Sequence, residues 1–430
     1  MNGKSMKPAL EKMVVETGRI IVGAVFVCSG FVKSIDPWGS AYKIQDYLNA
    51  FGLDFFNCLA LPASFLLFSV EFGIGISLLL GVYRKINTAF ALIFMAAVTP
   101  LTLYSAITNI VTDCGCFGDA LRLTNWETFF KNLPLLLISA VLFARHKRIT
   151  PLFTRNSALA TTLWAYLFIA GVGYYCVSHL PILDFRPYKV GANIPALMEI
   201  PENAEPPVFD TRLIYSKNGT QREFTIDDYP GEDSTWTFVA SKTVTVKKGY
   251  EPPVQGFSIS AQNGDDITDN VLSDKSYTFL LVAHKLEETS ENYAEQINDI
   301  YDYSVRFGYK FYALTASLPA EIAEWTKSTW AEYPICTTDG VVLKTIIRSN
   351  PGLLLLKNGT IINKWANGNL PDLSETNMPL NVDDTGKPAE KRSRRNVITL
   401  LLIFLTPLFI LFMKKRINTH ELNSARRLKQ

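Results

Sequence analysis

Long apolar runs without charge are confined to two parts of the chain, residues 1–180 and 397–413. Residues 181–396 have the mixed composition of a water-soluble segment. A single globular fold would not separate its apolar residues in this way, whereas a polytopic membrane domain, a soluble region and a final anchor would. The six helices that the pattern predicts cover residues 13–33, 55–82, 86–111, 127–144, 157–178 and 397–413.

Positive charge at the helix ends predicts the orientation. Lys and Arg side chains lie before the first predicted helix, between the second and third, between the fourth and fifth, and after the sixth. Because cytoplasmic loops carry an excess of Lys and Arg, these ends are predicted to be cytoplasmic. The chain would then lie in a bacterial cytoplasmic (inner) membrane, with residues 179–396 in the periplasm and residues 414–430 as a cytoplasmic tail.

Two basic segments need a separate interpretation. Lys4, Lys7 and Lys12 would suit the start of a cleaved signal peptide, but no small-residue cleavage site follows and further spans come after, so a retained helix is predicted. The run Lys391–Arg395 would lie outside the cell. Long translocated domains are exempt from the charge rule, and contact with lipid headgroups is the favoured interpretation of this run.

The residue composition and the hydrophobic pattern of the soluble region change along its length. Residues 179–270 are rich in Pro, Gly and alternating runs, which predicts a β-rich segment. Residues 271–370 alternate strand-like and helix-like runs and predict an α/β domain, and residues 371–396 are predicted to be a linker. The α/β elements are predicted at Tyr277–Ala283, Glu291–Phe307, Lys310–Thr315 and Leu318–Trp330, followed by a hairpin of Gly352–Leu356 and Thr360–Trp365 around Asn358-Gly359.

Composition adds one informative feature, the pair Cys114 and Cys116. The net charge of +2 gives no reason to expect nucleic acid as a partner. Cysteine accounts for only 6 of 430 residues, yet these two stand one glycine apart in the segment Asp113–Asp119. A redox pair, a metal site and a local disulfide are the alternatives. No histidine accompanies the pair in its predicted outer loop, so no metal site is predicted.

The predicted side of the membrane favours redox chemistry at this pair. The periplasm is oxidising, and a Cys-Gly-Cys disulfide closes a small strained ring that is easily reduced. Asp113 and Asp119 should raise the pKa of the thiols, which counts against fast nucleophilic attack.

The evidence for a redox role is weaker for the four other cysteines. Cys28, Cys58 and Cys176 lie near the outer ends of predicted helices and are candidate resolving partners for Cys114 and Cys116. They would serve equally as small apolar fillers between helices. Cys336 is a lone thiol in the soluble region, where a buried structural role is expected.

Glu71 is an ionisable group near the middle of a predicted membrane helix. Such a group is costly in a bilayer and usually pairs with another charge or serves a pathway. Arg19 is the cation predicted to lie at a comparable depth, so an intramembrane Arg19–Glu71 ion pair is predicted, with a structural role or a proton-handling role. Lys33, at the outer end of its helix and close to Asp36, is interpreted as an interfacial anchor.

The membrane segment resembles a known family. The run from Arg19 through Gly23 and Gly30 to Lys33, a following helix with Glu71, and Leu-Leu-Leu-Gly81 resemble the DoxX superfamily of small four-helix membrane proteins. The Asp-Cys-Gly-Cys-Phe-Gly segment is similar to its MauE branch. This resemblance spans residues 13–147. It implies a four-helix membrane bundle with extra helices, and a role in maturing disulfide-rich proteins through thiol–disulfide work.

Residues 276–370 resemble a thioredoxin-like domain of the TlpA or peroxiredoxin kind. The resemblance implies that Pro351, after Asn350, is cis and faces the active-site end. The family's Cys-x-x-Cys would follow the first strand, where this chain has His284-Lys285-Leu286-Glu287. The domain therefore cannot carry out dithiol exchange itself, and binding a peptide or partner, or docking on the membrane domain, is expected.

Two classes of function follow from these features. The first is a MauE-like thiol–disulfide redox or maturation factor for periplasmic proteins, with Cys114 and Cys116 as the reacting pair, which would make the protein a thiol–disulfide oxidoreductase. The second is a non-enzymatic DoxX-like scaffold or accessory subunit of a respiratory or envelope complex. The predicted partners are periplasmic clients or a membrane complex, together with the lipid bilayer. No cofactor is evident, and a quinone is compatible with this chemistry without a motif to support it.

Overall fold

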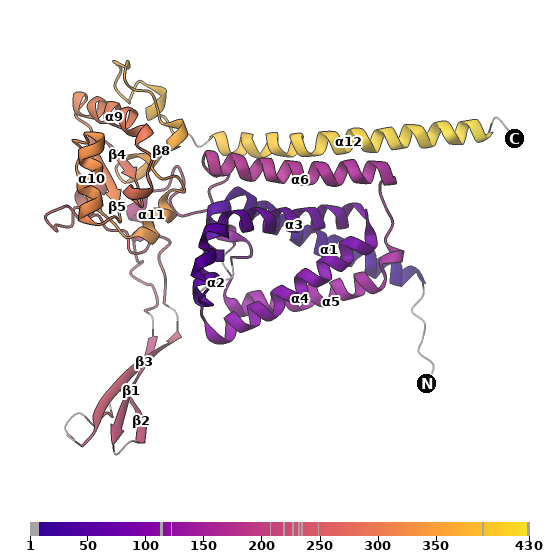
Figure 1. Cartoon of the computed structure of the whole chain (residues 1–430), viewed down its shortest axis with the longest axis horizontal. Helices are drawn as coiled ribbons and strands as arrows, with labels where there is room; N and C mark the ends of the chain where they lie inside the picture. Colours follow the sequence, from indigo (N-terminus) through magenta and orange to yellow (C-terminus); the bar gives the residue numbers. More distant parts are fainter. Residues whose placement is uncertain are drawn as a thin grey trace.

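The computed structural model describes residues 8–111, 115–121, 123–206, 208–217, 220–225, 228–230, 233, 235–247, 249–388 and 391–427. Within these residues, six helices are long and apolar enough to cross a membrane, and the chain is a multi-pass membrane protein. Four of them form a bundle, and two more lie side by side along it (Figure 1). The bundle helices are α1 (Pro8–Ile35), α3 (Ala60–Leu80), α4 (Arg84–Thr108) and α5 (Asn125–Ala144), and the flanking pair is α6 (Arg155–Ser178) and α12 (Lys391–Arg427).

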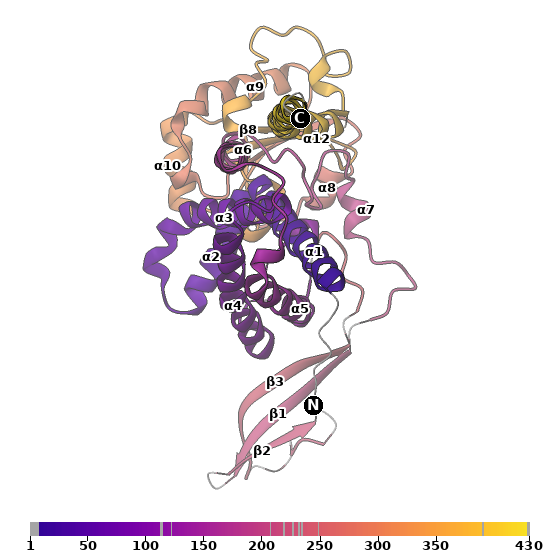
Figure 2. The same ribbon diagram turned by 90° about the vertical axis from the view of Figure 1, so that its right-hand side faces the viewer.

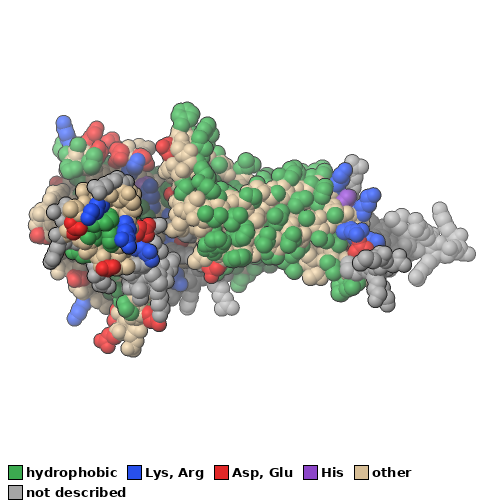
Figure 3. Space-filling view, turned by 90° about the horizontal axis from the view of Figure 1, so that it is seen from below, with side chains coloured by type: hydrophobic (Ala, Val, Ile, Leu, Met, Phe, Trp, Pro, Cys, Tyr) green, Lys and Arg blue, Asp and Glu red, His purple; other side chains and the backbone are tan. Residues whose placement is uncertain are grey.

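The soluble region caps one end of this bundle, and the first residues of α1 and the last residues of α12 lie at the other end (Figure 1). Figure 3 shows hydrophobic side chains covering this face of the helices, with Lys and Arg side chains gathered at the end away from the soluble region. An apolar band limited by charged ends is the surface that a bilayer requires.

Helices α1 and α3 touch through their backbones because glycines face each other. A Cβ atom added to Gly75 would lie 2.6 Å from the backbone nitrogen of Val27, and one added to Gly30 would lie 2.7 Å from the backbone nitrogen of Phe72. Small residues at such a crossing let membrane helices approach closely enough for dispersion contacts to hold them together. The contact also sets the relative positions of side chains on the same faces, including Lys33 and Glu71.

Two membrane-proximal elements differ from the predicted ones. Residues 34–54, which lie between the first two predicted helices, contain helix α2 (Pro37–Ala50), which lies across the end of the bundle next to the soluble region (Figures 1 and 2). Asp36 caps α2 by accepting the Gly39 N–H, and Pro37 occupies its first turn, which are ordinary start signals. Helix α12 runs well beyond the predicted 397–413 at both ends, because its charged flanks are good helix formers outside the bilayer.

The soluble region is built on a five-stranded mixed sheet in the order β6-β5-β4-β7-β8. Strand β4 pairs in parallel with β5, and β5 with β6, whereas β7 and β8 form the predicted antiparallel hairpin. Asn358 and Gly359 at its tip both have positive φ, as a two-residue type I′ turn requires. The strands are β4 (Tyr277–Val282), β5 (Lys310–Thr315), β6 (Ile335–Thr337), β7 (Gly352–Lys357) and β8 (Thr360–Ala366).

Both faces of this sheet are covered. Phe279 and Leu281 of β4 point into one core with helices α9 (Ala294–Arg306) and α10 (Pro319–Thr329). Leu280 and Val282 point into a second core, on the side of helix α11 (Gly340–Ile346). Alternate residues of a strand face opposite sides of the sheet, so a strand buried on both faces appears as the continuous apolar run seen here.

The boundaries within residues 179–396 differ from the predicted ones. Only β1 (Val208–Lys217), β2 (Thr220–Thr225) and β3 (Thr237–Lys247) form the separate β-rich unit, an antiparallel sheet in the order β2-β1-β3 that projects from the rest (Figures 1 and 2). Residues on either side of this unit, including Ile194 and Ile259, are buried in the α/β core. Within the predicted linker, Leu373 and Leu380 are also buried in the α/β domain. Apolar residues in a segment without strand or helix periodicity gave no signal of where they pack.

The glycine contact between α1 and α3 gives a first testable prediction. Gly75→Ala places a methyl group against the α1 backbone, so it should lower the stability of the membrane domain by about 1–3 kcal/mol. The measurement is the thermal unfolding midpoint of the purified full chain in detergent. Gly171→Ala in α6 is the matched control, because a Cβ atom there meets nothing within 4 Å. Equal losses in the two variants would contradict a role for close backbone contact.

Candidate functional site

A buried ion pair joins α1 and α3 inside the membrane domain. Lys33 Nζ lies 2.9 and 2.8 Å from the two carboxylate oxygens of Glu71, and the two side chains are only 8% and 6% exposed. Lys33 also donates to Ser29 Oγ at 2.7 Å, one helical turn earlier on α1. Such a pair is better tolerated in an apolar surrounding when the charges find further hydrogen-bond partners, and here the Lys33 ammonium finds two, Ser29 and the Cys116 carbonyl.

The predicted Arg19–Glu71 pair is wrong. Arg19 instead forms an ion pair with Glu16 at 2.6 Å and donates to the backbone carbonyls of Leu78 and Leu79. Arg19 and Lys33 are both on α1 but almost four turns apart, and the α1–α3 crossing places Glu71 opposite Lys33. Lys33 is therefore a buried partner of Glu71, and its interpretation as an interfacial anchor is also wrong.

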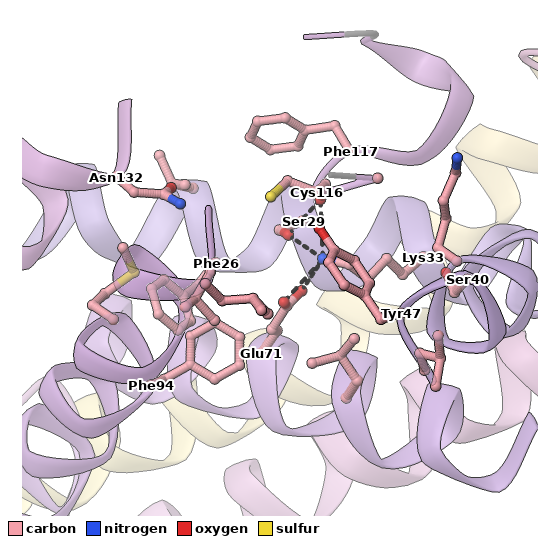
Figure 4. Close-up of a pocket in the computed structure, with 18 of the residues that line it drawn as sticks. Phe26, Ser29, Lys33, Ser40, Tyr47, Glu71, Phe94, Cys116, Phe117 and Asn132 are labelled. Atoms are coloured by element: carbon pink, nitrogen blue, oxygen red, sulfur yellow. Dashed lines mark hydrogen bonds and ion pairs between the residues drawn. The ribbon is translucent and has the colours of Figure 1, made fainter. Parts of the chain in front are cut away.

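The same cluster holds the loop that contains Cys116, which is described over residues 115–119 and is called the cysteine loop below. The backbone carbonyl of Cys116 accepts hydrogen bonds from Lys33 Nζ at 3.0 Å and from Ser29 Oγ at 2.8 Å, as Figure 4 shows. Cys116 is thus fixed by its own main chain above the ion pair, with its side chain half-buried. Cys114, its predicted redox partner, lies outside the described residues.

An apolar cavity of about 320 Å³ opens beside Cys116 (Figure 4). Helices α1 to α5 and the cysteine loop all contribute to its wall, and most of the lining side chains are apolar. Polar residues also line it. They are Ser29, Lys33, Ser40, Lys43, Tyr47, Glu71, Cys116, Lys131 and Asn132. Lys131 Nζ lies 4.4 Å from the centre of the Phe117 ring, which places a second cation next to the loop.

On the other side of the loop, a polar cavity of about 440 Å³ separates the membrane domain from the α/β domain. Lys33, Ser40, Lys43 and Gly115 line both cavities. The cysteine loop and the α1–α2 junction therefore form the wall between an apolar space inside the bundle and a polar space open to the soluble domain.

Arg348 of the α/β domain ties the two domains together at this wall. Its guanidinium contacts both carboxylate oxygens of Asp36, with a shortest distance of 2.7 Å, and lies 3.6 Å from Asp119 in the cysteine loop. Arg348 and Lys344 also face the ring of Tyr42 on α2. Burial alone would raise the pKa of Asp36, but the positive charges of Arg348 and Arg186 outweigh it and hold that pKa below its usual value.

The end of the α/β domain that meets α2 is the end at which thioredoxin-like proteins would carry Cys-x-x-Cys. His284 follows β4 there, and burial, together with Lys344, lowers the pKa of its imidazole to about 4. The Asn350–Pro351 peptide bond at this end is cis, as the resemblance implied, and Asn350 donates to the carbonyl of Lys285. This end contacts the membrane domain through Arg348 and Lys344.

The structure does not gather the other cysteines at the site. Cys28, Cys58 and Cys176 are free thiols, and none of them lines either cavity. Cys28 and Cys58 are exposed, and Cys176 packs among Phe68, Phe72 and other apolar side chains between α3 and α6. Cys336 is buried beneath the sheet, and burial raises the pKa of its thiol. Within the part of the chain that is described, no group of His, Cys, Asp and Glu side chains could hold a metal ion.

Sequence reasoning missed Lys33 and Arg348 as site residues. The signal for Lys33 was present, because Ser29 and Gly30 place a hydroxyl and a small residue one turn before it on the face toward Glu71. Arg348 gave no signal, since a single arginine after a helix is ordinary in a soluble domain.

Comparison with known families bears on two parts of the chain. Residues 11–145 match the family model described as Methylamine utilisation protein MauE. Residues 209–248, the projecting sheet, match a domain of unknown function, DUF8463. No curated protein matched the chain. The membrane domain up to the end of α5 is therefore MauE-like, while this match covers less than half of the chain.

The Lys33–Glu71 pair gives a second prediction. Lys33→Met or Glu71→Met alone leaves one buried charge without its partner and should destabilise the membrane domain by about 3–5 kcal/mol. The double variant removes both charges and should recover part of that loss. Thermal unfolding of the four proteins of this double-mutant cycle measures the coupling. Lys85→Met, at an exposed helix start, is the control, and strictly additive losses would contradict a direct pair.

The Arg348–Asp36 contact gives a third prediction. Arg348→Gln should release the α/β domain from α2, so that backbone amides of residues 37–50 and 115–121 exchange hydrogen faster in the full chain. Because the folded pKa of Asp36 is depressed, its stabilising effect is present above its ordinary pKa and is lost only as pH falls through the folded value.

Exchange protection of these segments, corrected for intrinsic rates, should therefore stay flat from about pH 5 to 9 in the wild-type chain. Lys387→Gln, which removes only an exposed contact with Asp384, is the control and should leave protection unchanged. Unchanged protection in Arg348→Gln would show that other contacts hold the domains together.

Proposed function

We propose that this protein is a membrane-embedded thiol–disulfide redox or maturation factor, with Cys114 and Cys116 as its reacting pair. One observation carries the proposal: the loop with Cys116 lies between an apolar cavity inside the membrane domain and a polar cavity facing the soluble domain. Cys116 lines the apolar cavity, and its neighbours Gly115 and Gly118 line the polar cavity, so the loop that carries this thiol meets two chemically different spaces. A relay between a client protein and a second redox partner requires such a position.

The electrostatics of the loop also suit such a relay. Lys33 and Ser29 hold the Cys116 carbonyl, and Lys131 lies over the neighbouring Phe117 ring. Asp119, a carboxylate expected to slow thiolate attack, lies 3.6 Å from the Arg348 guanidinium.

In this proposal the α/β domain is a degenerate thioredoxin-like domain that presents peptide clients. The parallel β4–β5 pair with an antiparallel β7–β8 hairpin on the other side of β4, helices on both faces, and the docking end near His284 support it. The soluble domain would lie in the periplasm, with the basic helix ends in the cytoplasm. Clients would then enter the polar cavity from an oxidising compartment.

A redox trapping experiment tests this function. Cells are quenched with acid, their thiols are alkylated with a large maleimide reagent, and the mobility of the full chain is compared under oxidising and reducing conditions. A redox-dependent shift is expected in the wild-type chain and should be lost in Cys114→Ser and in Cys116→Ser. Cys58→Ser, at an exposed thiol away from both cavities, is the matched control and should keep the dependence.

The competing function, a non-enzymatic scaffold, makes a different prediction for the same cells. If Cys114 and Cys116 stay reduced under all conditions, the redox function is wrong. Native affinity purification should then yield one stoichiometric partner, whereas a redox factor should be recovered with several clients in mixed disulfides.

A further inference from the structure

We propose that the basic end of the membrane domain carries a site for an anionic phospholipid, in a groove between the α3–α4 turn and the segment that leads into α6. The groove has a volume of about 490 Å³, within the range of about 300–1,000 Å³ that ligand sites occupy. It shares no residue with the two cavities at the cysteine loop, so the proposal is independent of the redox function. Its lining consists of residues 81–86 together with His146, Lys147, Pro151, Phe153 and Ala158.

The two walls of the groove are joined by main-chain contacts. Gly81 ends α3 in the left-handed conformation, with φ of 65°, and a Cβ atom there would lie 2.6 Å from the backbone of the opposite wall. The Leu152 N–H donates to the Leu80 carbonyl at 3.0 Å. Arg84 donates to the Ile149 carbonyl at 2.7 Å. A ligand therefore meets a preformed site, and little conformational entropy is lost when it binds.

The polar part of the lining is basic and has no carboxylate to balance it. Residues 72–112 and 128–183, which supply every lining residue, contain no Asp or Glu. Arg84 donates to uncharged carbonyl groups, which leave its positive charge in place. Lys85 and Lys147 form no ion pair with any residue that the structure describes. Three cations at the end of a membrane domain attract an anionic headgroup.

The two carboxylates of α1 at this end are engaged outside the groove. Glu11 lies 3.1 Å from a guanidinium nitrogen of Arg145. Glu16 pairs with Arg19 and accepts a hydrogen bond from the Thr150 hydroxyl at 2.7 Å. The positive charge around the groove is therefore left for an anion from outside the chain.

The remaining lining is apolar and distinguishes a lipid from a soluble anion. Val82, Phe153 and Ala158 belong to one apolar cluster, and Ile86 is 55% exposed. A phosphate ion gains nothing from this surface, whereas a phospholipid covers it with an acyl chain while its phosphate meets the cations. The Lys and Arg side chains gather where the apolar face of the helices ends, which is the level of the lipid headgroups (Figure 3).

Other segments of the same chain do not suit the groove. Residues 1–7 contain two Lys and no acidic residue, and residues 414–430 contain six Lys and Arg and a single Glu. A second copy of the chain would present the same basic end. Since like charges repel, these occupants are disfavoured, and the combination of cations with an apolar surface selects an anionic phospholipid.

The test is native mass spectrometry of the purified full chain in detergent, titrated with dioleoyl-phosphatidylglycerol or dioleoyl-phosphatidylcholine. The first phosphatidylglycerol should bind at least about tenfold more tightly than the first phosphatidylcholine. Lys85→Gln combined with Lys147→Gln removes two lining charges and should weaken phosphatidylglycerol binding about tenfold, with phosphatidylcholine binding unchanged.

Lys12→Gln combined with Arg145→Gln is the matched control. It removes two exposed charges at the same end that do not line the groove, and should retain the affinity for phosphatidylglycerol. In detergent without lipid, both double variants should unfold at the wild-type midpoint, so that weaker binding is not a folding defect. Equal losses of binding in the two double variants would overturn the proposal, because total charge rather than the groove would then attract the lipid.

Two further measurements use the unaltered chain. A phosphatidylglycerol with a diazirine in its acyl chain should form cross-links within residues 81–86 and 151–158, and cross-links spread evenly over the lipid-facing helices would overturn the proposal. Glycerol 1-phosphate, which has the headgroup phosphate without acyl chains, should fail to displace the lipid at about a hundredfold excess. Displacement would show a site for soluble anions instead. Neither result bears on the redox trapping experiment, so each hypothesis can fail alone.

Discussion

The buried ion pair between Lys33 and Glu71 is the interaction on which the arrangement around the site depends. It exists because glycines let α1 and α3 approach until their backbones touch, so that the two side chains meet within the apolar bundle. An ammonium in such a place must use all its protons, and the third direction is taken by the Cys116 carbonyl. The requirement to satisfy a buried charge therefore also fixes the position of the cysteine loop.

The loop is held from the opposite side by a second ion pair. Arg348, from the distant end of the chain, bridges Asp36 at the α1–α2 junction and Asp119 in the loop. The α/β domain thus docks with the end that carries His284 in place of cysteine, and a polar cavity remains at the contact. This arrangement is the one that the proposed function requires, in which the soluble domain would bind clients and the membrane domain would react.

Beyond its MauE-like membrane domain, the chain contains two further long helices, an α/β domain and a projecting sheet. Helix α6 and helix α12 pack against each other and connect the soluble domain to the bundle on both sides, with Trp164 donating to the carbonyl of Phe404. The two connections limit how far the α/β domain can move from the cysteine loop. The projecting three-stranded sheet, which matches a family of its own, lies away from both cavities and is available for other contacts.

The sequence by itself determined the membrane helices, the main strands and helices of the α/β domain and the Asn358-Gly359 hairpin. It also singled out Cys116 as a candidate site residue. Each of these depends on local pattern or composition. The sequence predicted a Glu71–Arg19 pair because the depth of a residue in the membrane can be estimated from its position along a helix. The rotation of one helix against another cannot be estimated in this way. Only the tertiary structure decided that Glu71 faces Lys33, that Arg348 reaches Asp36, and that two cavities meet at the cysteine loop. These are contacts between residues far apart in the chain, and side-chain packing, which no local periodicity encodes, selects among them.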